Sequence, residues 1–305
     1  MRARRDGVRA GTKERHALSM EFRPPVTAPG LGAYLAPGPM SFTDFVSSHA
    51  PHLLPTPAAA PAASGAAAGG LDVPHGTTIV ALTFRDGVVI AGDRRATSGN
   101  VIAQRDIEKI FITDSYSAVG IAGSAGVALQ MIRLYSADLE HYEKLEGVSL
   151  SFDGKANKLA QSVAANLGAA MQGFVVVPLF VGYDPEAGGG RIVNYDATGG
   201  RYDEHLGYNA VGSGSVFAKS ALKKTYDPNA DQAAAIRTAL AALYDAADDD
   251  TATGLPDLTR GLYPTVVSIT GAEGAVKRPT SEIEAIVRDI VAERTQSPST
   301  GTAEA

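Results

Sequence analysis

The order of elements along the chain predicts an α+β fold in which two antiparallel sheets pack together and a pair of helices covers each outer face. Strands come in runs interrupted by two pairs of helical patterns, so a doubly wound parallel sheet, which needs strictly alternating strands and helices, is not expected. Asp86–Gly87 separates two β-rich runs, which is a strong signal for a β-hairpin. The expected layers are therefore helix, sheet, sheet and helix.

The first hairpin is predicted from TTIVALTF at 77–84 and VVIAGD at 88–93. IEKIFIT at 107–113 and YSAVGIAG at 116–123, separated by two residues, predict a second hairpin. Apolar residues at helical spacing then predict a helix that ends at Gly147. The later elements follow in order: a helix over 155–173, strands over 175–184, 190–196 and 208–215, helices over 215–226 and 231–247, a strand over 263–271 and a helix over 281–294.

Composition excludes several classes of function. The chain has 305 residues, of which 45% are hydrophobic and 20% are charged, and its formal net charge is −6. This charge gives no indication of a nucleic-acid or acidic-lipid partner. The absence of cysteine excludes disulfides, thiolate catalysis and cysteine-ligated zinc. No apolar run approaches the roughly 18–20 residues of a membrane span. We therefore expect a cytoplasmic protein with no membrane partner.

The first 76 residues differ in composition from the rest of the chain. Residues 51–70 are rich in Ala, Pro and Gly, which is typical of a flexible linker. Upstream, SFTDFV at 41–46 is either a chance apolar cluster or a short segment that docks on a partner. The chain therefore divides into a largely disordered leader over 1–76, a folded domain over 77–294 and a disordered tail over 295–305.

The step from Gly76 to Thr77 has two interpretations. A threonine that opens a strand is usually there for its β-propensity. Alternatively, the bond between the two residues is a cleavage point and Thr77 becomes an N-terminus. A threonine hydroxyl is a poor nucleophile without a base. A free α-amine, with a reference pKa of about 7.7–8.0, would supply that base on Thr77 itself.

Three further features bear on this choice. Strand parity puts Lys109 on one face with Ile107 and Phe111, and a lysine on such an apolar face either reaches water or needs a carboxylate. Asp93 is the candidate counter-ion, although it could instead cap a helix or pair with a neighbouring arginine. AGSAG at 122–126 joins a strand to a helix, where free backbone N–H groups can form an oxyanion hole.

A set of motifs carries a resemblance to a known family. In order they are GTTIVAL, VVIAGDRRATSGN, EKIF, GIAGSAG, VGSGS and YDAADDDTATG. Together they resemble the β subunit of the 20S proteasome, most closely its actinobacterial form, from Thr77 to about Arg294. The segment around 41–54 resembles the prosegment of that group. The resemblance implies the N-terminal-nucleophile hydrolase fold, a four-layer αββα sandwich.

The resemblance implies a role for each matching catalytic residue. Thr77 matches the nucleophile, whose own amine accepts the proton. Asp93 matches the acid that orients the lysine, and Lys109 matches that lysine. Gly123 matches the residue whose N–H forms the oxyanion hole. The positions that hydrogen-bond around the threonine amine are matched by Ser213, Asp250 and Thr253.

One of these matches departs from the family pattern, because Thr253 stands where a serine is common, although the hydroxyl is kept. Asp248 and Asp249 are interpreted as a solvated helix end.

Thr97 matches the position whose backbone pairs with the substrate strand. The pocket for the side chain before the cut is matched by Ala96, Ile107, Ile121 and Ala125. These side chains are apolar, which favours cleavage after apolar residues.

The implied function is a threonine endopeptidase that is made as an inactive precursor and cuts itself at Gly76–Thr77. The family works as homo-heptameric β-rings stacked between rings of α subunits, fed with unfolded protein substrates by an ATP-dependent ring unfoldase. No metal or organic cofactor is implied. One alternative is the simpler bacterial two-ring threonine protease, which has a short leader rather than 76 residues. Another is a non-catalytic ring subunit, which usually lacks the threonine, the lysine or the aspartate.

Overall fold

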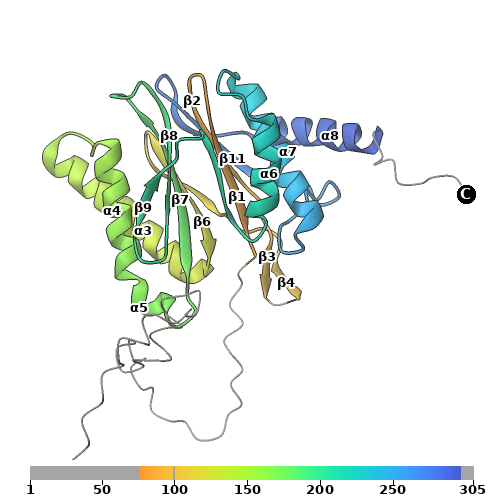
Figure 1. Cartoon of the computed structure of the whole chain (residues 1–305). Helices are drawn as coiled ribbons and strands as arrows, with labels where there is room; N and C mark the ends of the chain where they lie inside the picture. Colours follow the sequence, from red (N-terminus) through yellow and green to blue (C-terminus); the bar gives the residue numbers. More distant parts are fainter. Residues whose placement is uncertain (1–75, 99, 297–305) are drawn as a thin grey trace, which may run out of the picture. The chain divides into compact units, whose positions relative to one another are not determined.

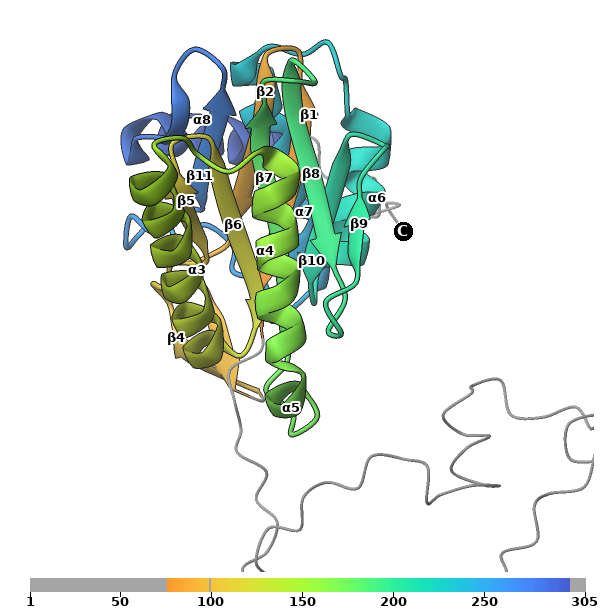
Figure 2. The same ribbon diagram turned by 90° about the vertical axis from the view of Figure 1, so that its left-hand side faces the viewer.

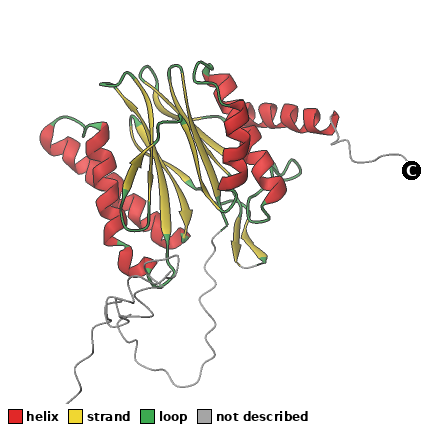
Figure 3. Ribbon diagram, in the orientation of Figure 1, coloured by secondary structure: helices red, strands yellow, loops and turns green. Residues whose placement is uncertain are grey.

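The computed structural model of the chain describes residues 76–98 and 100–296. Residues 1–75 of the expected leader over 1–76, with its 41–46 segment and its linker, lie outside the described residues, as do residues 297–305 of the expected tail over 295–305. Within the described part, two five-stranded antiparallel sheets pack face to face between two layers of helices (Figures 1 and 3). The predicted four-layer α+β fold is confirmed.

Both sheets are built from antiparallel neighbours. The first has the order β10-β1-β2-β11-β12 and the second the order β5-β6-β7-β8-β9. The first sheet contains β1 (Thr78–Phe84), β2 (Gly87–Gly92), β10 (Tyr208–Gly212), β11 (Thr265–Thr270) and β12 (Gly274–Lys277). The second contains β5 (Ile110–Asp114), β6 (Ser117–Gly123), β7 (Val176–Asp184), β8 (Gly189–Tyr195) and β9 (Arg201–Asp203). A separate ribbon pairs β3 (Ala96–Ser98) with β4 (Val101–Gln104).

The helices cover the two outer faces. On the second sheet lie α3 (Ala125–Glu146) and α4 (Phe152–Ala165), which run side by side in Figure 2 and are followed by the short α5 (Leu167–Ala170). On the first sheet lie α6 (Ser215–Thr225) and α7 (Gln232–Asp249), with α8 (Thr280–Gln296) packed against α7. No helix in the described ranges is both long enough and apolar enough to cross a bilayer.

The sandwich explains why the first strand is apolar at almost every position. Ile79 and Ala81 lie in the cluster between the sheets. Val80, Leu82 and Phe84 point the other way and pack in the cluster under α6, α7 and α8. Because both faces of the strand are buried, alternate positions cannot be polar, and the strand reads as a nearly continuous hydrophobic run.

The structure differs from the sequence expectation at several boundaries. The second helix begins at Phe152 rather than at 155, because Ser151 caps it by accepting a hydrogen bond from the Gly154 N–H at 3.2 Å. β5 begins at Ile110 rather than at 107, so Lys109 directly precedes the strand, and the prediction that it lies within the strand was wrong. The short strands that sequence reasoning missed are β3, β4, β9 and β12.

Candidate active site

The three candidate residues lie just outside the ends of strands, where the two sheets meet. Thr77 directly precedes β1 and Asp93 directly follows β2, and these two strands pair so that Ile79 stands opposite Gly92. The first hairpin therefore brings its own beginning and end together. Lys109, directly before β5, reaches the same place from the other sheet. Thr77, Asp93 and Lys109 are all buried.

Asp93 is a fully satisfied buried carboxylate. Its Oδ1 receives Lys109 Nζ at 2.7 Å and the Thr78 N–H at 2.8 Å. Its Oδ2 receives the backbone N–H groups of Arg95 and Gly254, both at 2.9 Å. Breaking a buried ion pair of this kind by removing one partner leaves an uncompensated charge, which is strongly destabilising. Of the interpretations open from sequence, the geometry selects the counter-ion of the lysine.

Lys109 directs its ammonium at the junction between Gly76 and Thr77. Besides Asp93, the Nζ donates to the carbonyl of Arg95 at 2.5 Å and to the carbonyl of Gly76 at 3.3 Å. Its side chain is only 4% exposed, so it does not reach water. This burial lowers the pKa of the Lys109 ammonium, while the Asp93 carboxylate opposes the shift. The neutral form of the lysine is therefore more accessible than in a surface lysine.

Thr77 is oriented toward the preceding carbonyl. Its Oγ1 donates to the carbonyl oxygen of Gly76 at 2.6 Å, and its own carbonyl accepts from the Ser213 N–H at 2.9 Å. Gly76 itself is enclosed. A Cβ placed there would lie 2.3 Å from Thr97 Oγ1 and 2.8 Å from the Ala252 carbonyl oxygen. Only glycine fits this position without displacing the segment.

A second hydrogen-bonded group lies beside Thr77. Asp250 caps the C-terminus of α7, and its Oδ2 receives the hydroxyls of Ser213 at 2.6 Å and Thr253 at 2.5 Å. These are the three residues expected around the threonine amine, and the structure brings them together. Asp248 and Asp249, the last two residues of α7, are exposed.

A small pocket opens next to Thr77 and contains the predicted apolar side chains. Gly123, at a φ of 107° that favours glycine, contributes to its wall. Thr97 does not line this pocket but borders Gly76 from β3. Sequence reasoning missed Leu129, which stands one helical turn after Ala125 and could have been found from that spacing. The pocket is lined by Gly76, Thr77, Ala96, Ile107, Glu108, Lys109, Ile121, Gly123, Ala125, Ala128 and Leu129.

Other residues of the site carried no sequence signal. Thr78 and Gly214 contact each other through the Thr78 hydroxyl, and neither was singled out. Arg95 is one of the arginines next to Asp93 in the sequence, which were considered only as its ion-pair partners, yet its Nη1 donates to the carbonyls of Thr251 at 3.1 Å and Thr253 at 3.2 Å. It thereby supports the loop that follows Asp250.

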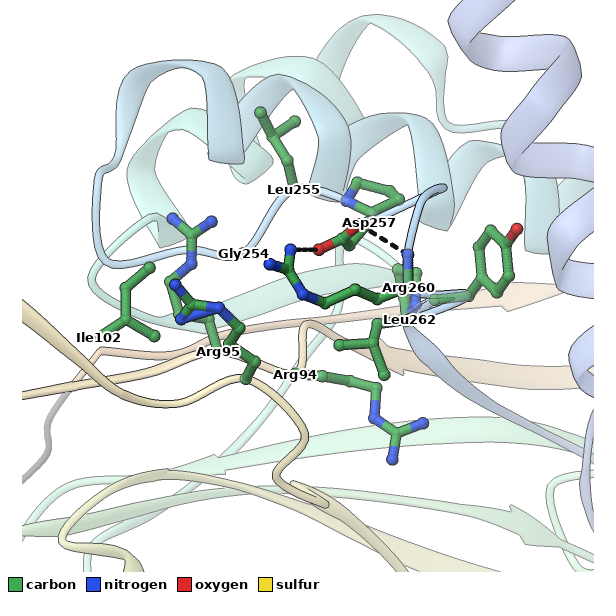
Figure 4. Close-up of a pocket in the computed structure, with 12 residues that line it drawn as sticks. Arg94, Arg95, Ile102, Gly254, Leu255, Asp257, Arg260 and Leu262 are labelled. Carbon is green, nitrogen blue, oxygen red and sulfur yellow. Dashed lines mark hydrogen bonds and ion pairs between the residues drawn. The ribbon is translucent and has the colours of Figure 1, made fainter.

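A separate pocket is lined in part by Arg95 and Gly254, the two residues whose N–H groups donate to Asp93 Oδ2 (Figure 4). Within it, Arg260 forms an ion pair with Asp257 at 2.6 Å. None of the sequence-predicted site residues lines this pocket.

Comparison with known proteins gives consistent matches over most of the chain. The profile of the family described as "Proteasome subunit" matches residues 73–256. A protein named "Proteasome subunit beta" from Saccharopolyspora erythraea is 60% identical over 270 residues, which cover 87% of this chain and 93% of the relative. Proteins of the same name from Rhodococcus jostii and Nocardia farcinica are 59% and 58% identical, each over 84% of this chain and over 90% and 91% of the relative.

Proposed function

Because the chain belongs to the proteasome subunit family, as a β subunit of the proteasome core, we propose that it is a threonine endopeptidase that matures by cutting the bond between Gly76 and Thr77. One observation carries the proposal. The Thr77 hydroxyl lies 2.6 Å from the Gly76 carbonyl oxygen, which the Lys109 ammonium also contacts. In this scheme residues 1–76 are the removed prosegment, 77–294 the catalytic domain and 295–305 a tail.

Self-cleavage begins with attack of Thr77 Oγ1 on the Gly76 carbonyl carbon. Before cleavage the Thr77 nitrogen is an amide and cannot act as a base. The neutral form of Lys109, which its lowered pKa makes more accessible, takes the hydroxyl proton and returns it to that nitrogen as the carbon–nitrogen bond breaks. The acyl group now sits on Oγ1 as an ester. Water hydrolyses the ester and releases Gly76 as a carboxylate.

Peptide hydrolysis then uses the free amine of Thr77. The amine accepts the Oγ1 proton as Oγ1 attacks the substrate carbonyl, and it returns the proton to the leaving amine. A second attack, by water, releases the acyl group. The Gly123 N–H is proposed to bind the oxyanion. Ser213, Asp250 and Thr253 hold the amine, and Lys109 keeps it neutral by lowering its pKa.

This cleavage is tested most directly by the intact mass of the wild-type chain in assembled particles. The expected first residue is Thr77. A chain that retains Gly76 in an active particle would contradict the proposal.

Replacing Gly76 by alanine is expected to slow self-cleavage. The added Cβ would approach Thr97 and Ala252 to less than 3.0 Å and push the Gly76 carbonyl away from the Thr77 hydroxyl. A misplacement on this scale lowers the rate by about 10- to 100-fold. The measurement is a time course of intact mass. Gly126→Ala is the matched control, because a Cβ there meets nothing within 4 Å. Equal processing of both variants would contradict the prediction.

The apolar pocket is proposed to select apolar side chains before the cut. Ile107→Ala enlarges the pocket, so the ratio of kcat/KM for an aromatic over a valine-sized side chain should rise about tenfold or more. Ile112→Ala is the control, because Ile112 is exposed and outside the pocket. Peptide substrates that differ only at this position give the measurement. The proposal fails if the ratio moves equally in both variants.

The partners follow from membership of the family rather than from contacts in the structure. We propose homo-heptameric β-rings stacked between rings of α subunits, with an ATP-dependent ring unfoldase that delivers unfolded substrates. Because the unfoldase consumes ATP, we also propose a cytoplasmic location. Native mass spectrometry after co-expression with α subunits would test the ring stoichiometry.

A further inference from the structure

Thr78 is the neighbour of the proposed nucleophile, and its side chain has no part in the chemistry described above. It is fully buried, with 0% of its surface exposed. Its backbone N–H donates to Asp93 Oδ1 at 2.8 Å, the same oxygen that receives Lys109 Nζ at 2.7 Å. The main chain of Thr78 is therefore hydrogen-bonded to the Asp93–Lys109 ion pair.

The hydroxyl of Thr78 is hydrogen-bonded to the group that contains Thr253 and Asp250. Its Oγ1 accepts from the Gly214 N–H at 2.9 Å and lies 2.6 Å from Thr253 Oγ1. Thr253 Oγ1 in turn lies 2.5 Å from Asp250 Oδ2. An ionised carboxylate can only accept, so the Thr253 proton goes to Asp250 and the proton between the two threonines comes from Thr78.

These hydrogen bonds form a chain in which every donor points the same way. It runs from the Gly214 N–H through the hydroxyls of Thr78 and Thr253 to the Asp250 carboxylate. Hydrogen bonds in such chains polarise and strengthen one another. The two hydroxyls are also tightly enclosed, because a Cβ at Gly214 would lie 2.5 Å from Thr78 Oγ1 and 2.7 Å from Thr253 Oγ1. Among the described residues, the Thr78 hydroxyl is the only group that donates a hydrogen bond to Thr253 Oγ1.

The peptide group between Thr77 and Thr78 is also held at both ends, by two hydrogen bonds of its backbone atoms. Its carbonyl accepts from the Ser213 N–H at 2.9 Å, and its N–H donates to Asp93. Rotation of this group would carry Thr77 Oγ1 away from the Gly76 carbonyl. It would also move the Thr77 nitrogen relative to Asp250.

We propose that Thr78 is a positioning residue that couples the Asp93–Lys109 pair to the group formed by Asp250, Thr253 and Ser213, and so holds Thr77 in its reactive orientation. The inference rests on the proposed function, since it concerns the orientation of the Thr77 nucleophile and amine. Thr78 does not touch the substrate or transfer a proton itself. Removing its hydroxyl should therefore affect kcat rather than KM.

The experiment compares Thr78→Val, Thr78→Ser and wild type as full chains co-expressed with α subunits. Thr78→Val keeps the shape of the side chain and the backbone N–H but removes the hydroxyl, whereas Thr78→Ser keeps the hydroxyl. Thr83→Val is the matched control, because Thr83 lies on the same strand and its hydroxyl bonds Gly207 and Tyr226 at the far end. The readouts are the rate of cleavage at Gly76–Thr77, kcat, KM and the pH profile.

In Thr78→Val we expect kcat and the cleavage rate to fall about tenfold or more, with KM nearly unchanged. Thr253 is then free to turn from Asp250, whose charge attracts the protonated Thr77 amine more strongly. The acid limb of the kcat profile should therefore move to higher pH. Thr78→Ser should restore wild-type behaviour, and Thr83→Val should show none of these changes.

Several results would overturn the inference. Thr78→Val with wild-type kcat and pH profile would do so, as would equal losses in Thr83→Val or a failure of Thr78→Ser to rescue. If Thr78→Val does not assemble, Thr78→Ala replaces it; if neither assembles while Thr83→Val does, the residue is structural and the inference is wrong. Absence of cleavage and hydrolysis in the wild type would instead refute the proposed function.

Discussion

In Thr77→Ala, the bond between residues 76 and 77 should remain uncut and peptide hydrolysis should fall by about 10⁶-fold, the scale seen when a catalytic nucleophile is removed. The physical reason is that the Thr77 hydroxyl is the group that lies 2.6 Å from the Gly76 carbonyl oxygen. Alanine keeps the backbone, whose carbonyl still accepts from Ser213. The fold should therefore persist. Intact mass and peptide turnover of the assembled particle provide the measurement.

Thr77→Ser separates the hydroxyl from the rest of the side chain. It should still be processed and should retain part of the turnover, because Oγ is kept and only the methyl group is lost. If Thr77→Ala is processed at the same bond as the wild type, another agent makes the cut and self-cleavage is wrong. If Thr77→Ser behaves like Thr77→Ala, the hydroxyl does not account for the loss.

In Lys109→Ala, peptide turnover should fall by about 10²- to 10⁴-fold, the usual contribution of a positioned acid or base. The ammonium contacts Asp93 at 2.7 Å and the Gly76 carbonyl at 3.3 Å, so its loss affects both maturation and the later hydrolysis. The variant also leaves Asp93 buried without its cation, which lowers stability by about 3–5 kcal/mol. Thermal unfolding must therefore be measured beside turnover.

Two comparisons distinguish loss of catalysis from loss of fold. Lys158→Ala removes a surface lysine paired with Asp138 at 3.0 Å, and it should leave turnover unchanged. Turnover of Lys109→Ala is compared with wild type only in particles that native mass spectrometry shows to be assembled. Wild-type turnover in an assembled Lys109→Ala particle would remove the lysine from the mechanism.

Long elements and the principal site were predictable because their signals are local. Three predicted features each depend on a few neighbouring residues, and the structure contains all of them. They are the hairpin at Asp86–Gly87, the helix after Gly123 and the end of that helix at Gly147. The short strands were not predictable. β3, β9 and β12 have three or four residues each, too few for a periodic pattern, and they are defined by the strand with which they pair.

The sequence by itself determined the residues of the candidate site that stand in distinctive motifs, including Thr77, Asp93 and Lys109. Only the tertiary structure decided how they are held. Both oxygens of Asp93 are occupied, and one of the donors, the Gly254 N–H, lies 161 residues away in the chain. The Thr78 hydroxyl meets Thr253 across 175 residues. A buried carboxylate or hydroxyl takes its partners from whichever segments the packed sheets bring beside it, and no local pattern records which segments those are.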